Sequence, residues 1–279
     1  MNLAGKRVLI TGAASGLGRA AATALQKAGA LVVGLDKNSV AVGNGMRLIV
    51  ADVRDPRGIA AAVEDAVLRL GGLDVLINNA GVLSLQDAGS APGDDVREAI
   101  EVNLLGPWRV TAAALPALQK SGGHVINIAS LFALVNAPLI PAYASSKRAL
   151  TAYSDVLRSQ YGDRIKVSTI YPGYMDTPIH DGAVRQGLSV AKIVRFDIGG
   201  RTLVTFEESL DAAARRIVRA CAKGQVRDGG MTVRGWLTLM LARHAPGLTD
   251  RVAAARLRQL TRNGMSIRLD VATQSSQQL

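Results

Sequence analysis

The 279-residue chain has a single cysteine, Cys221, and three histidines that lie far apart, at positions 124, 180 and 244. One cysteine excludes an internal disulfide and suits a reducing compartment. Scattered histidines with one cysteine give no recognisable spacing of metal ligands. We therefore expect no metal site.

The sequence also lacks an unbroken apolar run long enough to span a membrane. Residues 125–146 hold no ionisable side chain except Tyr143, but Asn127, Pro138 and Pro141 interrupt them. This pattern predicts a buried strand followed by a loop. The N-terminal apolar run, residues 8–10, is too short for a secretory signal. We expect a cytoplasmic protein.

The chain has no low-complexity linker and no internal repeat, and its 48% hydrophobic and 20% charged residues are ordinary for a globular protein. The net charge of +11 is uneven, because residues 185–279 hold 16 Lys and Arg against 7 Asp and Glu. We interpret these charges as a solvated face, with attraction to anionic lipid headgroups as the alternative. Without an aromatic stacking platform or a helix-turn-helix pattern, we expect no nucleic-acid partner.

Six short segments rich in Val, Ile and Leu, each bounded by Gly, Asp, Asn or Ser, are typical of buried strands. They are residues 6–12, 30–36, 46–52, 73–79, 124–130 and 164–173. Between them, apolar residues recur at helical spacing, as at Leu17, Ala21 and Leu25. This alternation predicts an α/β fold, a Rossmann-type doubly wound parallel sheet flanked by helices on both faces. We assign residues 1–230 to this single domain and residues 231–279 to a helical extension.

A glycine-rich turn, TGAASGLG from Thr11 to Gly18, directly follows the first strand and opens the first helix. Such a turn lets the backbone approach a pyrophosphate, and the helix N-terminus offers free N–H groups and partial positive charge. The second strand ends at Asp36, whose carboxylate can accept hydrogen bonds from an adenosine ribose and would repel a 2′-phosphate. NAD is therefore favoured over NADP, although Lys37 would soften the repulsion.

Two further strand ends suit the same cofactor. Asp52 closes the third predicted strand and is placed to reach an adenine amino group. Asn79, Ala80 and Gly81 close the fourth, where small residues would let a dinucleotide lie against the strand end. Ligands of open α/β sheets bind at these carboxyl ends.

Tyr143 and Lys147 lie four residues apart, and therefore on one face of a predicted helix. Moving a hydride to or from an alcohol carbon requires a group that takes or supplies the hydroxyl proton. Tyrosine is a poor base, but a neighbouring ammonium favours the phenolate and should lower its pKa. Ser130 ends the preceding strand and could stabilise charge developing on the substrate oxygen.

Taken together and in order, these motifs resemble the short-chain dehydrogenase/reductase family over about residues 5–225. The matching positions are TGxxxGxG at Thr11–Gly18, the segment Asn78–Gly81, Asn103, Ser130, the YxxxK pair Tyr143 and Lys147, and YPGYMDTP at residues 171–178.

The resemblance implies a set of site residues. Those for the cofactor are Gly12, Ser15, Gly16, Leu17, Gly18, Asp36, Asp52, Val53, Asn79, Ala80, Gly81, Tyr143, Lys147, Pro172, Gly173 and Thr177. The catalytic set is Asn103, Ser130, Tyr143 and Lys147, in which Lys147 also holds the nicotinamide ribose and Asn103 a proton-relaying water. The substrate would meet Ser130, Phe132, Tyr143 and Tyr174. The resemblance further implies a homodimer or homotetramer.

The chain departs from the common family pattern after about residue 230, where apolar helical patterning continues with regular arginines. This extension could be a lid over the substrate cleft, a helix at a subunit interface, or a peripheral membrane contact. Residues 178–207 occupy the place of the family's substrate loop. The substrate wall near Ser130 is expected from uncharged residues, namely Leu131, Phe132, Leu134, Leu139 and Ile140.

An uncharged wall predicts a hydrophobic secondary alcohol or ketone, such as a steroid, terpenoid or lipid-derived carbonyl. Arg185, Arg195 or Arg201 could instead supply a partner for an acidic substrate. We therefore expect an NAD(H)-dependent oxidoreductase with Tyr143 as general acid/base. The alternatives are a non-catalytic NAD-sensing or regulatory protein on the same fold, or an epimerase or dehydratase of the same family.

Overall fold

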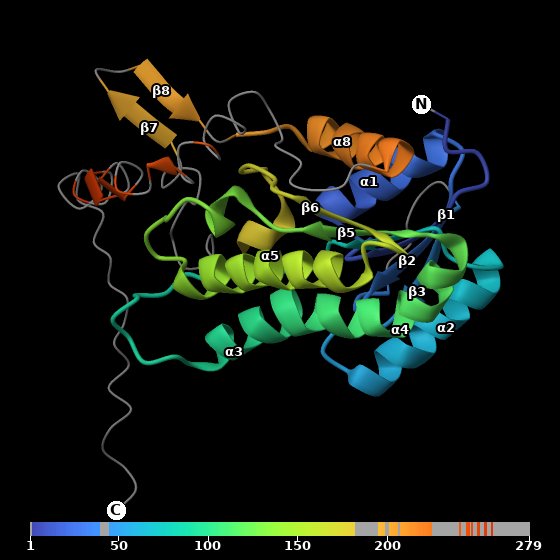
Figure 1. Cartoon of the computed structure of the whole chain (residues 1–279). Helices are drawn as coiled ribbons and strands as arrows, with labels where there is room; N and C mark the ends of the chain where they lie inside the picture. The colour runs from blue at the N-terminus through green and yellow to red at the C-terminus, as the bar shows by residue number, and fades with distance from the viewer. Residues whose placement is uncertain are drawn as a thin grey trace, which may run out of the picture.

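The computed structural model describes residues 2–39, 45–181, 195–198, 201–205 and 207–224, with some single residues between 240 and 258. Its centre is a six-stranded parallel sheet in the order β3-β2-β1-β4-β5-β6 (Figure 1). The strands are β1 (Arg7–Thr11), β2 (Leu31–Asp36), β3 (Arg47–Val50), β4 (Val75–Asn78), β5 (His124–Ile128) and β6 (Lys166–Ile170). Each lies inside a predicted strand segment, and the Rossmann-type fold is confirmed.

Helices cover both faces of the sheet, as the alternation of strand and helix predicted (Figure 1). One face packs against α1 (Gly16–Lys27) and α8 (Leu210–Lys223). The other packs against α2 (Pro56–Leu70) and α4 (Gly106–Ser121), and α5 (Pro141–Tyr161) lies on that same side. Two shorter helical segments, α3 (Asp94–Ile100) and a π-helical turn (Glu101–Leu105), lead into α4.

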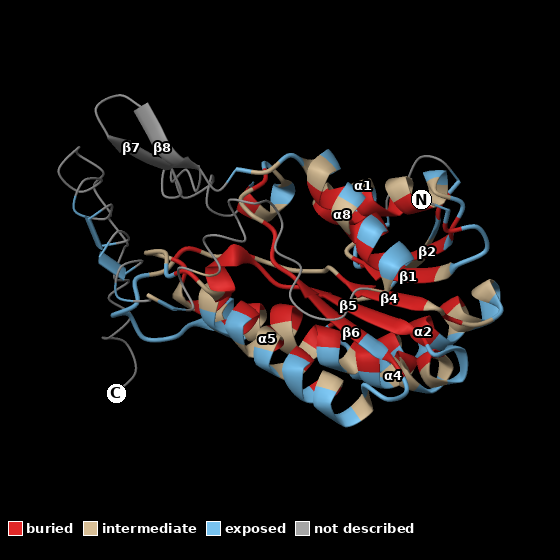
Figure 2. Cartoon of the chain, turned by 45° about the horizontal axis from the view of Figure 1, so that its top comes forward, coloured by how far each residue is buried: buried red, intermediate tan, exposed pale blue. Residues whose placement is uncertain are grey.

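The core forms two layers because successive residues of a strand point to opposite faces. On β1, Val8 and Ile10 contact the α1–α8 layer, whereas Leu9 contacts the α2–α4 layer. Figure 2 shows the buried residues concentrated in the sheet and on the helix faces turned toward it. A strand buried on both sides must be apolar throughout, and this is why the strands were readable from sequence.

The order in which strands are added to the sheet reverses between β1 and β4. From β1 the chain proceeds outward to β2 and β3, then returns to β4 and proceeds to β5 and β6. Loops at the carboxyl ends of β1 and β4 therefore separate and leave a crevice, where doubly wound sheets bind their ligands.

The region expected to be a substrate loop contains two short antiparallel strands, β7 (Arg195–Ile198) and β8 (Arg201–Thr205). The sequence did not predict these strands, although Gly199-Gly200, which separates them in the sequence, is a known hairpin signal. The rest of that region between residues 182 and 194 lies outside the described residues. So does most of the predicted extension at 231–279, and its role stays a prediction.

Within the described part of the chain, no helix is both long and apolar enough to cross a membrane. The uncharged stretch at 125–146 forms β5, a 3₁₀ turn (Leu131–Ala133), a loop and the start of α5. A buried strand followed by a loop was predicted there.

Candidate active site

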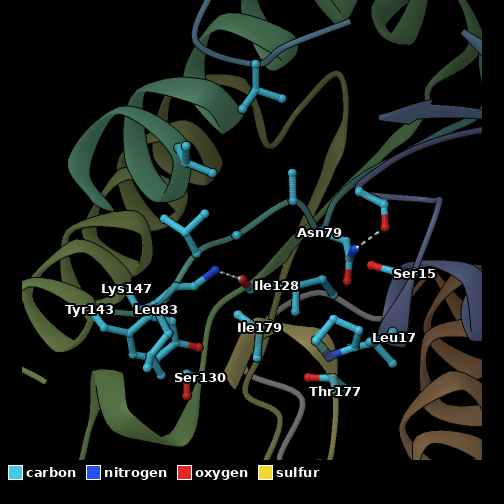
Figure 3. A pocket seen from close by; sticks show the side chains of 18 of the residues that line it. Ser15, Leu17, Asn79, Leu83, Ile128, Ser130, Tyr143, Lys147, Thr177 and Ile179 are labelled. Carbon is cyan, nitrogen blue, oxygen red and sulfur yellow. Dashed lines mark hydrogen bonds between the residues drawn. The ribbon is translucent and has the colours of Figure 1, made fainter. Parts of the chain in front are cut away.

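A cavity of about 560 Å³ lies at the carboxyl ends of the parallel strands, within the usual size range of small-molecule sites. Segments that follow all six strands contribute to its walls (Figure 3). Of the residues expected to bind cofactor or substrate, it is lined by Gly12, Ser15, Gly16, Leu17, Asp36, Asp52, Val53, Asn79, Ala80, Gly81, Ser130, Phe132, Tyr143, Lys147, Pro172, Gly173, Tyr174 and Thr177. Gly18 and Asn103 are not among the lining residues.

The glycine loop packs closely against the end of β4. Gly12 has a φ of +66°, and a Cβ there would lie 2.9 Å from the Ala80 Cα. The Thr11 hydroxyl accepts hydrogen bonds of 3.0 Å from the backbone N–H groups of Asn79 and Ala80. The Asn79 side chain donates to the Thr11 and Gly12 carbonyls, at 3.0 and 3.2 Å. These contacts join the two motifs into one rigid edge of the cavity.

Gly18, predicted at the cofactor, has a packing role in the structure. A Cβ on Gly18 would lie 2.0 Å from the Gly12 carbonyl oxygen and 2.5 Å from the Asn79 Nδ2. Glycine is required because the first turn of α1 passes directly over the loop. The residue therefore shapes the loop that borders the cavity.

The N-terminus of α1 faces the cavity and fits an anionic group. Its N-cap, Ser15, makes no side-chain capping bond, and the first turn carries no acidic residue. The helix N-terminus thus keeps its partial positive charge and N–H donors. Gly16 has no side chain to fill the space toward Thr177, whose Cβ would be 3.4 Å from a Cβ on Gly16. These features suit the pyrophosphate of a dinucleotide.

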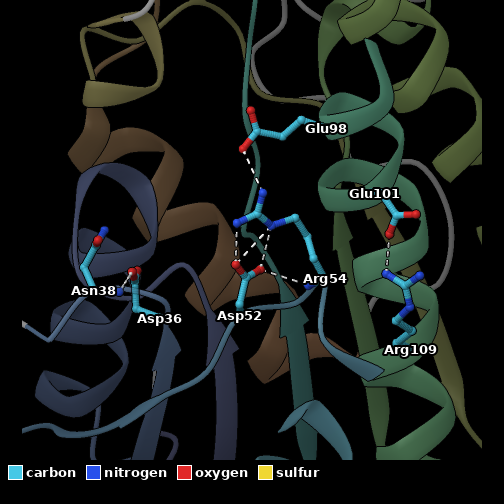
Figure 4. Close-up of polar contacts among 7 residues, drawn as sticks. All are labelled: Asp36, Asn38, Asp52, Arg54, Glu98, Glu101 and Arg109. Carbon is cyan, nitrogen blue, oxygen red and sulfur yellow. Dashed lines mark hydrogen bonds and ion pairs between the residues drawn. The ribbon is translucent and has the colours of Figure 1, made fainter. Parts of the chain in front are cut away.

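One end of the cavity is rich in charged and polar side chains (Figure 4). The Asp36 carboxylate, at the end of β2, accepts hydrogen bonds of 3.0 Å from the backbone N–H groups of Ala14 and Asn38. This fixes the carboxylate at the cavity wall, where an adenosine ribose was expected. Lys37 and Asn38 line the wall beside it.

Asp52 is held by a partner that the sequence analysis missed. The Arg54 guanidinium contacts both Asp52 carboxylate oxygens, at 2.7–3.1 Å, and reaches Glu98 at 3.4 Å. The pKa of Asp52 is lowered, chiefly by its hydrogen bond with Arg54. Asp52 therefore lines the cavity as half of an ion pair, so its carboxylate is already engaged. Arg54 follows Asp52 by two residues, and this proximity was the available signal.

The other end of the cavity holds Tyr143, Ser130 and Lys147 (Figure 3). Tyr143 and Lys147 lie on successive turns of α5, and Ser130 follows β5. The Lys147 Nζ donates a hydrogen bond of 2.8 Å to the Ile128 carbonyl oxygen and lies 5.9 Å from the centre of the Tyr143 ring. All three side chains are buried, with exposed fractions of 3–7%.

Burial shifts the pKa of Tyr143 and the pKa of Lys147 in opposite directions. It raises the pKa of Tyr143, and a hydrogen bond with Ser130 partly offsets that rise. Burial also lowers the pKa of Lys147 to about 8. The sequence predicted that Lys147 would lower the pKa of Tyr143; in the free protein burial raises this pKa, and Ser130 is the group that opposes the rise.

Asn103 lies just behind this group, in the π-helical turn that joins α3 to α4. Its side chain accepts from the Val82 N–H at 2.9 Å and donates to the Val82 carbonyl and the Ser146 hydroxyl, at 2.9 and 3.0 Å. Its Oδ1 would be 3.2 Å from a Cβ on Gly81, and the Lys147 Nζ would be 3.4 Å from the same point. Asn103 thus fastens the segment after β4 to α5 near Lys147.

The wall beside Tyr143 is apolar. Leu83, Phe132, Tyr174 and Ile179 line it and belong to one apolar cluster with Tyr143. Of the five residues expected in this wall, Phe132 lines the cavity. Leu139 and Ile140 pack in the same cluster, whereas Leu131 and Leu134 pack in another. The last two were misplaced because the 3₁₀ turn directs successive side chains to different sides.

His180 is a further lining residue that the sequence analysis missed. Its ring packs on Tyr174, with the ring centres 4.8 Å apart, and its Nε2 lies 3.1 Å from the Met175 carbonyl oxygen. Burial lowers its pKa, which favours the neutral ring. The side chains of Arg185, Arg195 and Arg201, predicted as partners for an acidic substrate, lie outside the described residues.

The chain matches a family model, known proteins of similar sequence, and solved structures. The family model for short chain dehydrogenases matches residues 6–186. The Mus musculus protein dehydrogenase/reductase SDR family member 7B is 31% identical over 270 residues, covering 90% of this chain and 81% of the mouse protein. Oxidoreductase UcpA of Escherichia coli K12 is 36% identical over 196 residues, covering 66% of this chain and 74% of UcpA.

Solved structures share the fold. The 3-ketoacyl-(acyl-carrier-protein) reductase from Brucella melitensis, crystallised as a complex with NADH, matches with a TM-score of 0.69 and 25% identity. The match covers 81% of this chain and 96% of that reductase.

Proposed function

The chain belongs to the short-chain dehydrogenase family, and on that premise we propose that it transfers a hydride between NAD(H) and a hydrophobic secondary alcohol or ketone. Membership makes it an oxidoreductase of the dehydrogenase/reductase type. The NADH complex of the Brucella melitensis reductase supports a nicotinamide dinucleotide as the cofactor. The choice of NAD, the substrate class and the role of Tyr143 are the parts proposed here.

The proposal depends most on the grouping of Tyr143, Ser130 and Lys147 in the cavity that the glycine loop borders. A hydride transfer requires a proton donor or acceptor beside the reacting oxygen. Tyr143 and Ser130 both line the cavity and lie near each other (Figure 3), so both hydroxyls could contact one substrate oxygen. The bound cofactor would supply the hydride or accept it.

In the direction of reduction, Tyr143 would act as the proton donor. Burial raises its pKa, so the phenol holds its proton at neutral pH. Tyr143 can therefore donate this proton to the carbonyl oxygen, while Ser130 donates a hydrogen bond to the same atom. Lys147, whose pKa is about 8, is still mostly charged at neutral pH and would stabilise the phenolate that remains.

Asp36 supports NAD as the cofactor. Its carboxylate is fixed at the wall by two backbone N–H groups, where it could accept hydrogen bonds from a ribose. A 2′-phosphate at that place would meet a fixed negative charge. Lys37 and Arg54 line the same end, but Arg54 is engaged by Asp52 and Glu98.

The distribution of charge supports a hydrophobic substrate. Leu83, Phe132, Tyr174 and Ile179 surround the Tyr143 end, and among the lining residues that the structure describes Lys147 is the charged side chain there. The other charged lining residues, among them Asp36, Asp52 and Glu98, lie at the opposite end. Apart from Lys147, which is hydrogen-bonded to the Ile128 carbonyl oxygen, the described part of this wall offers an anionic substrate no counterion.

A substrate panel tests the proposal. Steroid, terpenoid and aliphatic secondary alcohols and ketones would be offered with NAD(H) and NADP(H), beside sugars and small polar hydroxy acids, while absorbance of the reduced nicotinamide is followed. We expect turnover of the hydrophobic compounds with NAD(H). Turnover of polar compounds only would overturn the substrate class, and turnover with NADP(H) only would overturn the cofactor.

A further inference from the structure

The segment Pro172–Tyr174 lines the Tyr143 end of the cavity and follows β6 without regular secondary structure. The Leu131 N–H donates to the Pro172 carbonyl at 3.0 Å. Two further contacts of the segment come from one residue, Glu208. Its carboxylate accepts from the Gly173 N–H at 3.3 Å, and its own N–H donates to the Tyr174 carbonyl at 2.8 Å.

Glu208 is an unusual residue to find in this place, because its side chain is only 3% exposed. Burial raises the pKa of its carboxyl group, opposed by the charge of Arg216 and by the hydrogen bond from Gly173. Arg216 extends from α8 and donates to the other carboxylate oxygen. The ion pair therefore leaves one Glu208 oxygen directed at the Gly173 N–H.

A buried ion pair usually contributes little net stability to a protein. Removing two charges from water is costly, and apolar residues of similar volume often replace a buried pair without loss. The pair does something that apolar residues could not do, since it presents a fixed acceptor to the backbone of the cavity wall. Its contact with Gly173 therefore indicates its role.

Helix α8 connects this acceptor to the glycine loop. Ala213 and Ile217 of α8 share an apolar cluster with Leu17 and Ala21 of α1, the helix that the loop opens. The helix that carries Arg216 is thus packed on the helix behind the pyrophosphate site. Through Glu208 it also holds the wall at the other end of the cavity.

We propose that the Glu208–Arg216 ion pair is a positioning element that fixes Gly173, and with it the cavity wall against which the nicotinamide half of the cofactor binds. Neither residue is among those that line the cavity. The pair acts through Pro172, Gly173 and Tyr174. This inference rests on the proposed use of a nicotinamide dinucleotide.

The test compares binding of NADH with binding of ADP-ribose, which lacks the nicotinamide. Dissociation constants would be measured by calorimetry for the wild type and for Glu208→Met/Arg216→Met, which removes both charges and the acceptor. We expect ADP-ribose affinity to stay nearly constant and NADH affinity to fall by about two- to tenfold, the effect of one lost hydrogen bond. Glu208→Gln/Arg216→Met keeps an acceptor for Gly173 and should restore most of the NADH affinity.

The control is Asp65→Met/Arg69→Met, which removes an exposed ion pair on α2 and should change neither affinity. If the first double variant does not fold, Glu208→Leu/Arg216→Leu asks the same question, because it also removes both charges and the acceptor for Gly173.

Two results would overturn the proposal. One is an equal change in the affinities for NADH and ADP-ribose in Glu208→Met/Arg216→Met, which leaves their ratio unchanged. The other is an NADH affinity in Glu208→Gln/Arg216→Met that is no higher than in Glu208→Met/Arg216→Met. A wild type that binds neither nucleotide would instead refute the proposed function, and the inference with it.

Discussion

The Lys147 ammonium donates a hydrogen bond of 2.8 Å to the Ile128 carbonyl oxygen, and this bond fastens α5 to the end of β5. Tyr143 lies one turn before Lys147 on α5, and Ser130 lies two residues after Ile128. The lysine therefore holds together the two elements that carry the Tyr143 and Ser130 hydroxyls. Any charge effect it has on the reaction comes in addition to this structural role.

The burial of Lys147 predicts a specific dependence of stability on pH. Its pKa falls from the ordinary 10.5 to about 8 in the folded protein. Between these pH values the unfolded chain binds a proton that the folded chain does not, so the stability contributed at this site rises with pH. Lys147→Met removes the effect. The free energy of unfolding of the wild type, relative to this variant, should rise by roughly 3 kcal/mol from pH 8 to 10.5.

Urea unfolding of both proteins across this pH range measures that difference. Using the difference cancels the titration of other groups that both proteins share. A difference that stays flat with pH would show that Lys147 keeps its ordinary pKa in the folded state.

The packing of Gly18 predicts that even one methyl group disrupts the glycine loop. The Cβ of Gly18→Ala would lie 2.0 Å from the Gly12 carbonyl oxygen. We expect a loss of about 1–3 kcal/mol of stability and a fall of about tenfold or more in dinucleotide affinity. Gly89→Ala is the matched control, since the nearest atom to its Cβ, the Asp87 Oδ1, would be 3.5 Å away. Equal behaviour of the two variants in thermal melts and calorimetry would contradict this account.

The Asp36 carboxylate is expected to set the preference for NAD over NADP. Asp36→Ala removes the carboxylate that would accept from a ribose and repel a 2′-phosphate. NAD affinity should fall and NADP affinity should rise, so that their ratio shifts by about 100-fold, or roughly 3 kcal/mol. Asp36 also binds the Ala14 and Asn38 N–H groups, and for this reason the ratio is the informative quantity.

Asp65→Ala is the control for that experiment. Asp65 is an exposed carboxylate on α2 that does not line the cavity, so its loss should affect both nucleotides alike. A preference that does not move in Asp36→Ala would remove Asp36 as the determinant of cofactor choice.

The sequence predicted most of the fold because buried parallel strands are apolar along their whole length. Val8, Leu9 and Ile10 are all fully buried, and a run of this kind has few other interpretations. The site residues were predictable for a related reason. They follow strand ends, and the topology brings strand ends together.

The parts that the sequence could not predict depend on the direction of side chains or on the surroundings of a residue. The Arg54–Asp52 pair requires a particular side-chain conformation, and Glu208 meets Gly173 only after folding. Likewise, helical spacing placed Tyr143 beside Lys147, but the pKa of Tyr143 depends on how much water folding removes. The π-helical turn around Asn103 has no simple sequence signature.

The most direct test of the central claim is the activity of Tyr143→Phe with a substrate identified by the panel. The variant loses the hydroxyl but keeps the ring, so binding of NADH and the melting temperature should stay close to those of the wild type. We predict that kcat/KM falls by about 10²- to 10⁴-fold, the usual contribution of a general acid or base. Activity within about tenfold of the wild type, with NADH still bound, would show that another group supplies the proton.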